Sequence, residues 1–488
     1  MLDKISKYRF LSTSALSALL LTTGCTNREK VSQPNILWII ADDLGVELGC
    51  YGVDHVYTPN IDRLASQGTL YRNMFTVAAV SSVSRSSMIT GMYPTSIDCH
   101  QHRKQYKIPL SDPIIPITEY FRQAGYFVCN GSVNDRTKFG KTDYNFTHDV
   151  KTLYDGTDWR EREEGQPFFA QIQISYPHRP FIEDKEHPVD PNLVDIPLYY
   201  PDHPITRKDW AMYLETVQAV DRQVGVILQR LENEGLLDNT IIFFFGDQGH
   251  PHVRSKQFMY EEGTNTPLIV RWPGFLSPGG ECYDLISNID LSAQALRAAG
   301  IEIPSYMHGQ PFIGGKAPKR AYIASMRDRM DETVDRIRAI RTEQFRYIRN
   351  FYPELPYAQW NSYKKFNYPV LTLMQVMLKN GELTDNQAHF LSESRPVEEL
   401  YDIQKDPFCL NNLADDPTLN EELLKMRDIM DNWLVKYDLA IYPETQEEID
   451  YAKRIMDEQF KTWMSKTGLS PDISDEDFLE WWKKKLMP

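Results

Sequence analysis

The chain has 488 residues, of which 42% are hydrophobic and 12% aromatic, and its formal net charge is −15 at pH 7. This composition excludes an intrinsically disordered chain, and the length predicts one large α/β domain with a smaller domain appended to it. The negative charge argues against a nucleic-acid partner and against coating by a long polyanion, so an anionic substrate must be captured at a local site.

The N-terminal segment predicts export from a bacterial cell. A basic stretch, a short apolar stretch and a small residue precede Cys25, which is the layout of a lipoprotein signal peptide over residues 1–25. The apolar run is too short to span a membrane. The alternative to a signal peptide is a buried N-terminal helix. We expect lipidation at Cys25, a polar tether at 26–34, and a location in the periplasm or at the outer membrane through the lipid anchor alone.

Strand and helix signals alternate up to about residue 320. In chain order we expect strands at 35–40, 126–129, 167–174 and 240–245, and helices at 58–65, from 81 onward, at 117–125 and at 210–231. An early proline opens the first of these helices, and a glycine closes the one at 117–125. The alternation predicts a catalytic domain over 35–320 with a mostly parallel sheet flanked by helices.

From about residue 321 the pattern changes. Short strands separated by turns are expected at 321–325, 337–341 and 345–349, and an amphipathic helix is expected near 421–434. This pattern predicts a C-terminal α+β subdomain over 321–488 with an antiparallel sheet and a covering helix. The aromatic-rich residues 352–395 are longer than a connector requires, and they either form a substrate wall or serve in packing.

Two of the expected strands end in acidic residues. Asp42 and Asp43 follow the strand at 35–40, and Asp247 and Gln248 follow the strand at 240–245. Because parallel strands direct their carboxyl ends to one crevice, we expect these side chains to meet there. Their oxygen atoms form a hard ligand set that suits Ca²⁺ or Mg²⁺ rather than Zn²⁺. The alternative is that each acidic cluster caps a turn.

Ser81 lies at the start of an expected helix, four residues before Arg85. A hydroxyl beside an arginine at a helix start is placed to become a nucleophile that faces an anion. The alternative is that Ser81 is only a helix N-cap. His100 and His102 follow this helix closely, which makes both of them candidate substrate contacts.

With these segments together, the chain resembles the sulfatases, the arylsulfatase-type branch of the alkaline-phosphatase-like fold. The resemblance rests on Ala41-Asp42-Asp43, on the signature Ser81–Gly91 and on Gly246-Asp247-Gln248-Gly249, which occur in the family's order. It continues through segments at 57–65, 93–94, 264–274 and 399–402. The element Pro177-His178-Arg179 is similar to the sulfamidase-like branch of the family.

The resemblance implies a modified residue at position 81. In this family the cysteine or serine at that position is oxidised after translation to formylglycine, whose hydrated aldehyde attacks sulfur. A serine at this position implies either the anaerobic-type maturation enzyme of bacteria as a partner or an engineered replacement of cysteine. Val83 departs from the Pro, Ala or Ser that the family usually has there.

The resemblance also implies roles for other side chains. Arg85 would hold the hydrated aldehyde, Lys256 would contact the sulfate, and His178 would protonate the leaving group, because its proton affinity lies near neutral pH. The implied calcium ligands are Asp42, Asp43, residue Ser81 itself, Asp247 and Gln248, with Gln248 in place of the usual Asn. The further catalytic candidate is Lys141, and the candidate substrate contacts are His100, His102, Arg179 and His250.

One motif departs from the family. Where family members carry Gly-Lys-x-His, this chain has Gly140-Lys141-Thr142-Asp143. Lys141 would still supply a positive charge for the sulfate, and Asp143 is one candidate for the proton acceptor. An alternative alignment uses Lys138 instead of Lys141.

Three functions follow from this reading. The leading one is a sulfuric ester hydrolase that removes O-sulfate or N-sulfate from a saccharide, such as a glycosaminoglycan or another host or algal glycan fragment. The second keeps the fold but hydrolyses phosphodiesters or phosphonates. The third is a lipid-anchored glycan-binding protein without turnover, in which Ser81 is never oxidised.

Overall fold

The computed structural model describes residues 33–439 and 444–487. The described residues from 34 onward form one compact unit. The predicted signal peptide, with Cys25, and most of the predicted tether at 26–34 lie outside the described residues. Within the described ranges, no helix is both long enough and apolar enough to cross a membrane.

A seven-stranded sheet forms the centre of this unit. In spatial order its strands are β4 (Phe127–Ser132), β5 (Phe168–Pro177), β1 (Asn35–Asp42), β6 (Thr240–Gly246), β7 (Leu268–Arg271), β2 (Thr69–Tyr71) and β8 (Gly280–Cys282). Strands β4, β5, β1 and β6 are parallel, whereas β7 runs antiparallel to β6 and β2. The prediction of a mostly parallel sheet is therefore confirmed.

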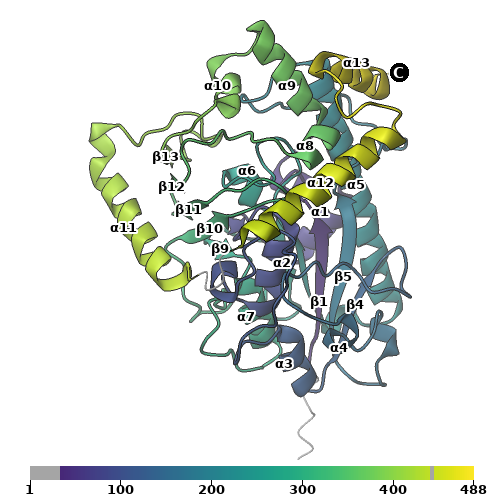
Figure 1. The fold of residues 1–488 in the computed structure, drawn as a ribbon. Helices are drawn as coiled ribbons and strands as arrows, with labels where there is room; N and C mark the ends of the chain where they lie inside the picture. Colours follow the sequence, from purple (N-terminus) through teal and green to yellow (C-terminus); the bar gives the residue numbers. More distant parts are fainter. Residues whose placement is uncertain (1–32, 440–443, 488) are drawn as a thin grey trace, which may run out of the picture. The chain divides into compact units, whose positions relative to one another are not determined.

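Helices cover both faces of this sheet (Figure 1). They are α1 (Pro59–Gln67), α2 (Ser81–Thr90), α3 (Ile117–Gln123), α4 (Val150–Leu153), α5 (Pro204–Asn233) and α7 (Asp290–Ala298). The short helix α6 (Glu261–Thr264) precedes β7. Leu37 and Ile39 of β1 pack in one cluster with α1 and α5, and Ile36 and Trp38 pack in another with α2, α3 and α7. Alternate side chains of β1 thus face two apolar layers, as its unbroken apolar sequence predicts.

Helix α2 is made largely of small polar residues, yet it is buried along its whole length. The hydroxyls of Ser86, Ser87 and Thr90 donate to the carbonyls four residues before them, at 2.6, 3.0 and 2.8 Å. These bonds satisfy hydroxyl groups that burial would otherwise leave unpaired. The helix ends at Gly91, whose φ of 68° is the left-handed conformation that glycine adopts readily.

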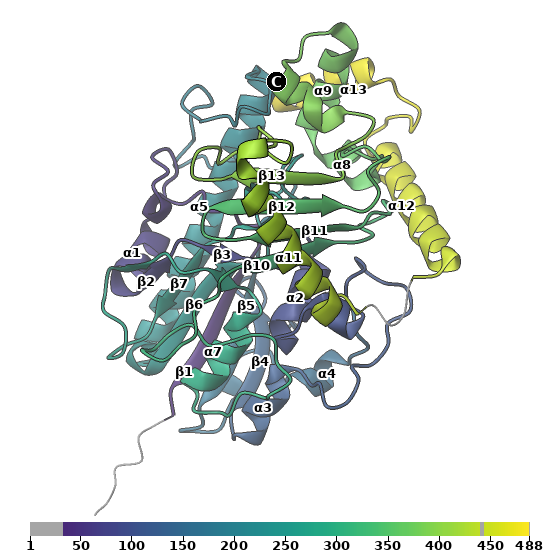
Figure 2. The same ribbon diagram turned by 90° about the vertical axis from the view of Figure 1, so that its left-hand side faces the viewer.

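A second, antiparallel sheet follows from residue 323. Its strands are β10 (Ile323–Arg327), β11 (Ile337–Arg341), β12 (Phe345–Asn350) and β13 (Glu398–Asp402). Helix α11 (Asn420–Tyr437) lies across one face of this sheet, and Met426 and Trp433 pack on Ile340 and Tyr347 in one apolar cluster (Figure 2). The predicted C-terminal α+β subdomain with a covering helix is confirmed.

The remaining helices belong to the C-terminal part, and one small sheet belongs to the catalytic domain. They are α8 (Ser362–Asn367), α9 (Pro369–Asn380), α10 (Asp385–Ala388), α12 (Gln446–Lys466) and α13 (Asp475–Leu486), and a two-stranded sheet joins β3 (Met74–Phe75) to β9 (Ile286–Ser287). Phe460 of α12 and Phe478 of α13 pack with Leu373 of α9 and Ile205 of α5. The aromatic-rich segment 352–395 is therefore largely helical and packs against the catalytic domain.

Candidate active site

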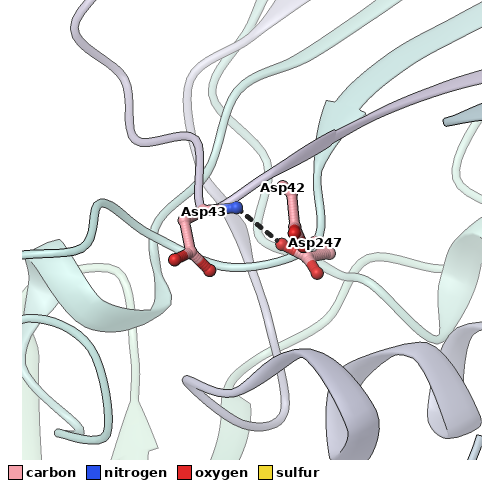
Figure 3. Close-up of side chains that lie close together, drawn as sticks. All are labelled: Asp42, Asp43 and Asp247. Atoms are coloured by element: carbon pink, nitrogen blue, oxygen red, sulfur yellow. Dashed lines mark hydrogen bonds between the residues drawn. The ribbon is translucent and has the colours of Figure 1, made fainter. Parts of the chain in front are cut away.

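Three aspartates meet at the carboxyl ends of two neighbouring strands. Asp42 ends β1, Asp43 follows it, Asp247 follows β6, and the two strands are in register at Ala41 and Gly246. One oxygen of each carboxylate lies within 4.8 Å of the others, and all three side chains are buried (Figure 3). The adjacency of the strands thus brings together residues that are about 200 positions apart.

The backbone at the end of β1 turns sharply to form this cluster. Asp43 has a φ of 64°, a left-handed conformation that Asp tolerates better than most residues. Its N–H donates to Asp247 Oδ1 at 2.9 Å, the bond drawn in Figure 3. The turn therefore brings the backbone N–H of Asp43 to the carboxylate of Asp247.

Three basic side chains balance the charge of the aspartates. Lys141 Nζ lies 2.7 Å from Asp42 Oδ1, Lys256 Nζ lies 2.6 Å from Asp43 Oδ2, and Arg85 Nε lies 2.8 Å from Asp247 Oδ2. Arg85 also reaches Asp42 Oδ1 at 3.2 Å. The site therefore combines a compact negative centre with a surrounding positive shell.

The pKa values reflect this crowding. Burial opposes ionisation of Asp42, but Lys141 and Arg85 outweigh it and hold the pKa of that carboxyl well below its usual range. Burial raises the pKa of Asp247 to about 6, Arg85 works against that rise, and the charge of Asp42 adds to it. The carboxyl group of Asp247 is thus hard to ionise with these side chains alone. A bound cation would favour its ionised form.

Gln248 supplies a further sign that a cation fits here. Its Nε2 donates to Asp43 Oδ1, while its Oε1 is buried and has no hydrogen-bond partner among the described residues. A buried amide oxygen without a partner costs free energy, and a hard cation is a partner it can accept. The residues present therefore fit a Ca²⁺ or Mg²⁺ ion held by Asp42, Asp43, Asp247 and Gln248.

Ser81 lies beside this cluster. It is the first residue of α2, it is only 4% exposed, and its Oγ donates to Asp42 Oδ1 at 3.3 Å. Arg85, one helical turn later, points the same way, because its Nη1 donates to Gln173 Oε1 at 2.6 Å while its other nitrogens reach the aspartates. The structure thus brings together the hydroxyl, the arginine and the acidic groups, as the sequence predicts.

His178 faces the cluster from the end of β5. Its Nδ1 lies 2.6 Å from the carbonyl of Arg179, and its Nε2 lies 3.8 Å from Asp43 Oδ2 and 3.3 Å from the hydroxyl of Tyr363. Since a carbonyl only accepts, Nδ1 carries a proton and Nε2 is the nitrogen directed to the site. Burial lowers the pKa of His178, assisted by the positive charge of Lys256.

Lys141, from the segment that differs from the family's Gly-Lys-x-His motif, lies in the site. It contacts Asp42, whereas Lys138 pairs with Asp135 at 3.0 Å and its side chain is 79% exposed. The alignment with Lys141 is therefore the one that places a lysine in the site. Asp143 accepts from Arg103 Nε and Nη2 at 3.3 and 3.1 Å.

Four predicted substrate contacts lie in different surroundings. Arg179 is buried, pairs with both oxygens of Asp209 at 2.7 and 2.5 Å, and donates to the carbonyls of Pro251 and Asn367. Four donor contacts are thus used inside the protein. This geometry favours a structural role for Arg179 over substrate binding, because a buried charge requires such partners.

His250 and His100 are also buried. His250 Nδ1 lies 2.9 Å from both His252 Nδ1 and Ser255 Oγ, and burial lowers the pKa of His250 to about 4. Burial likewise lowers the pKa of His100, and the charges that act on it are those of Asp328 and Arg338, with smaller contributions from Asp98 and Asp438. Among the described residues, neither histidine forms a hydrogen bond or an ion pair with the three aspartates, although the charge of Asp43 acts on His250. His102 pairs with a fourth aspartate outside this cluster: its Nδ1 lies 3.0 Å from Asp331 Oδ1.

Several site residues had no clear sequence signal. Gln173 holds Arg85, Tyr363 contacts His178, and Arg103 holds Asp143. Gln173 alternates with Gln171 in the buried part of β5, and polar side chains in a buried strand indicate buried polar partners. Tyr363 lies 185 positions from His178, so only the folded chain shows the pair.

Comparisons with known proteins agree with this geometry. Residues 34–301 match the family model described as Sulfatase, and residues 249–370 match the model described as N-sulphoglucosamine sulphohydrolase, C-terminal. An ulvan-active sulfatase of Formosa agariphila is 32% identical over 469 residues, which cover 85% of this chain and 77% of that protein. The N-sulphoglucosamine sulphohydrolase of Homo sapiens is 27% identical over 485 residues, covering 86% and 93%.

A solved structure extends the comparison to the fold. The phosphonate monoester hydrolase of Agrobacterium radiobacter superposes with a TM-score of 0.61 at 17% identity, covering 85% of this chain and 98% of that one. At this identity the likeness shows the alkaline-phosphatase-like fold and no more. The family is decided by sequence: the Sulfatase model spans more than half of the chain, and the chain belongs to the sulfatase family of sulfuric ester hydrolases.

Proposed function

We propose that this sulfatase removes sulfate from a saccharide with residue 81 oxidised to formylglycine and with Ca²⁺ bound at Asp42, Asp43, Asp247 and Gln248. The observation that carries the proposal is the position of Ser81 Oγ, 3.3 Å from Asp42 in a centre with three aspartates and an unpartnered amide oxygen. A flexible oxygen-rich site of this kind suits Ca²⁺.

The two absent groups would supply defined chemistry. When present, Ca²⁺ would offset the carboxylate charge and draw sulfate oxygens, and the hydrated aldehyde would supply the attacking oxygen. The chain supplies the rest: Arg85, Lys141 and Lys256 surround the site with positive charge that a sulfate group can engage. Because these side chains are already held in place, they cost little reorganisation when charge develops on the transferring group.

His178 is placed to serve the leaving group. The bond from Nδ1 to the Arg179 carbonyl fixes the ring, so proton transfer takes place at Nε2, which faces Asp43 and the Tyr363 hydroxyl. A protonated Nε2 would donate to the departing oxygen or nitrogen of the sugar. Lys256 Nζ lies 5.2 Å from the centre of the Tyr363 ring, so the lysine and the histidine share one wall of the site.

The saccharide substrate is inferred from the relatives. The Formosa relative is named for activity on ulvan, and the human relative is named for hydrolysis of N-sulphoglucosamine. Both align over most of this chain. We therefore propose a sulfated glycan fragment, with O-sulfate and N-sulfate to be separated by assay. The lipid anchor at Cys25, the periplasmic or outer-membrane location and the anaerobic-type maturation enzyme belong to the same proposal and rest on the sequence.

The test is a release assay with matured enzyme. Protein produced in a host that oxidises serine is incubated with glucosamine bearing N-sulfate or 6-O-sulfate, with ulvan oligosaccharides, and with phosphonate monoesters and phosphodiesters. We expect sulfate release from at least one saccharide, and none from Ser81→Ala. Faster cleavage of a phosphonate or phosphodiester than of every sulfate would favour the second function, and saccharide binding without any release would favour the third.

A further inference from the structure

Asp143 stands where the resemblance expects a histidine, and its carboxylate is already engaged. It accepts two bonds from Arg103 and lies 4.0 Å from Lys141 Nζ. Burial opposes the charge of Asp143, but Arg103 and Lys141 outweigh it, so its pKa lies below the usual value. A carboxylate held in this way is a weak proton acceptor. The site therefore lacks a base at this position.

His102 approaches the same region from the loop after α2. The next residue, Arg103, donates its backbone N–H to Ser82 Oγ at 3.2 Å, which ties the loop to the first turn of α2 beside residue 81. The backbone N–H of His102 donates to the carbonyl of Arg329 at 3.0 Å. The loop is thus fixed both to the nucleophile helix and to the segment after β10.

Asp331 fixes the orientation of the His102 ring. Its Oδ1 lies 3.0 Å from His102 Nδ1, and its Oδ2 accepts from Gln257 Nε2 at 2.9 Å and from Asn361 Nδ2 at 3.2 Å. The backbone N–H of Asp331 also lies 3.3 Å from Nδ1, but an unprotonated nitrogen would face the carboxylate unfavourably. Nδ1 therefore carries the proton and donates to Asp331, a charge-assisted bond.

This arrangement leaves Nε2 of His102 as the accepting nitrogen. Among the described residues, no side chain forms a hydrogen bond with Nε2. This atom is not one of the fully buried polar atoms that lack a partner, so it keeps some exposure to solvent. The charged groups around the ring are Asp331, Arg103 and Asp143, so the ring lies on the side of the altered motif. Burial lowers the pKa of His102, which keeps the ring neutral and able to accept a proton at neutral pH.

We propose that His102, oriented by Asp331, is the proton acceptor that releases sulfate from residue 81, in place of the histidine that this chain lacks at position 143. The inference rests on the proposed function. Nε2 takes the proton of the free hydroxyl on the residue-81 carbon, and the electrons of that O–H bond form the carbonyl. The bond from the same carbon to the sulfate-bearing oxygen breaks, and sulfate leaves with its electron pair. Asp331 is a positioning residue in this scheme.

The test follows covalent sulfate on the peptide as well as turnover. Matured wild-type enzyme, His102→Ala and His102→Gln are mixed with a sulfated saccharide that the wild type hydrolyses, quenched, digested with trypsin, and the mass of the peptide Asn73–Arg85 is measured. His102→Gln keeps an amide that can donate to Asp331, so it guards against loss of folding. His187→Ala, which removes an exposed histidine whose ring centre lies 4.2 Å from that of Tyr57, is the matched control.

We expect both His102 variants to release one equivalent of desulfated sugar, to retain sulfate on the peptide and to turn over about 100-fold more slowly. The wild type and His187→Ala should show no retained sulfate. Turnover at the wild-type rate, or loss of the first equivalent of product without retained sulfate, would overturn the role of His102. A wild type that releases no sulfate from any saccharide would instead overturn the proposed function, and the inference with it.

Discussion

Replacement of Arg179 by alanine separates two roles for this side chain. As one of the basic residues near the predicted site, Arg179 is a candidate substrate contact, whereas the structure places the guanidinium in the interior, over the rings of Phe181 and Tyr368, with Asp209 as its partner. If the role is structural, Arg179→Ala leaves Asp209 as an unpaired buried charge and removes the donors to two backbone carbonyls. If the role is substrate binding, folding should be little affected.

The size of the effect follows from burial. Both side chains of the pair are less than 5% exposed, so solvent screens them little. Removal of one partner of such a pair costs about 3–5 kcal/mol, whereas exposed substitutions stay within about 0.5 kcal/mol. With an m-value of about 3 kcal/mol/M, the midpoint of urea unfolding should fall by roughly 1–1.7 M.

Tryptophan fluorescence during urea titration measures this midpoint. Arg136→Ala removes an exposed arginine and is the control, and Arg179→Met with Asp209→Leu removes both charges, which should recover most of the loss. Michaelis constants are measured on the folded fraction in parallel. An unchanged midpoint together with a raised KM for Arg179→Ala would refute the structural role and restore the substrate contact.

Three further predictions concern the site. Lys141→Ala should reduce kcat/KM by about 100-fold and Lys138→Ala should leave it unchanged, and the reverse order would reinstate the other alignment. Ca²⁺ at a hundredfold excess over its Kd should stabilise the protein by about 2.7 kcal/mol in thermal unfolding, and equal stabilisation of Asp247→Ala would place the ion elsewhere. Tyr363→Phe should lower kcat/KM about fivefold through loss of the bond to His178, and a wild-type value would make that contact incidental.

The sequence predicted the parts of the site that depend on local patterns. Apolar strands that end in Asp42, Asp43 and Asp247 indicate where parallel strands deliver acidic groups. Ser81 and Arg85 share one face of α2, because residues four apart are neighbours on a helix. These signals involve short segments, so they can be read without knowledge of the tertiary structure.

The parts that were missed depend on contacts between distant segments. Asp331 and Tyr363 lie on the C-terminal half of the chain, and their partners His102 and His178 lie more than 180 positions earlier. Arg179 and His250 adjoin site residues in sequence, but their side chains point into the interior, where Asp209 and His252 receive them. Proximity in sequence to a motif therefore does not decide which way a side chain points.

The central claim is that residue 81 becomes an oxidised nucleophile beside the three aspartates. The mass of the tryptic peptide Asn73–Arg85, taken from protein isolated from its own host, measures this directly. We expect the peptide to have lost two hydrogen atoms through conversion of Ser81 to formylglycine. A peptide that carries only unmodified serine would contradict catalysis by residue 81 and would favour a glycan-binding role.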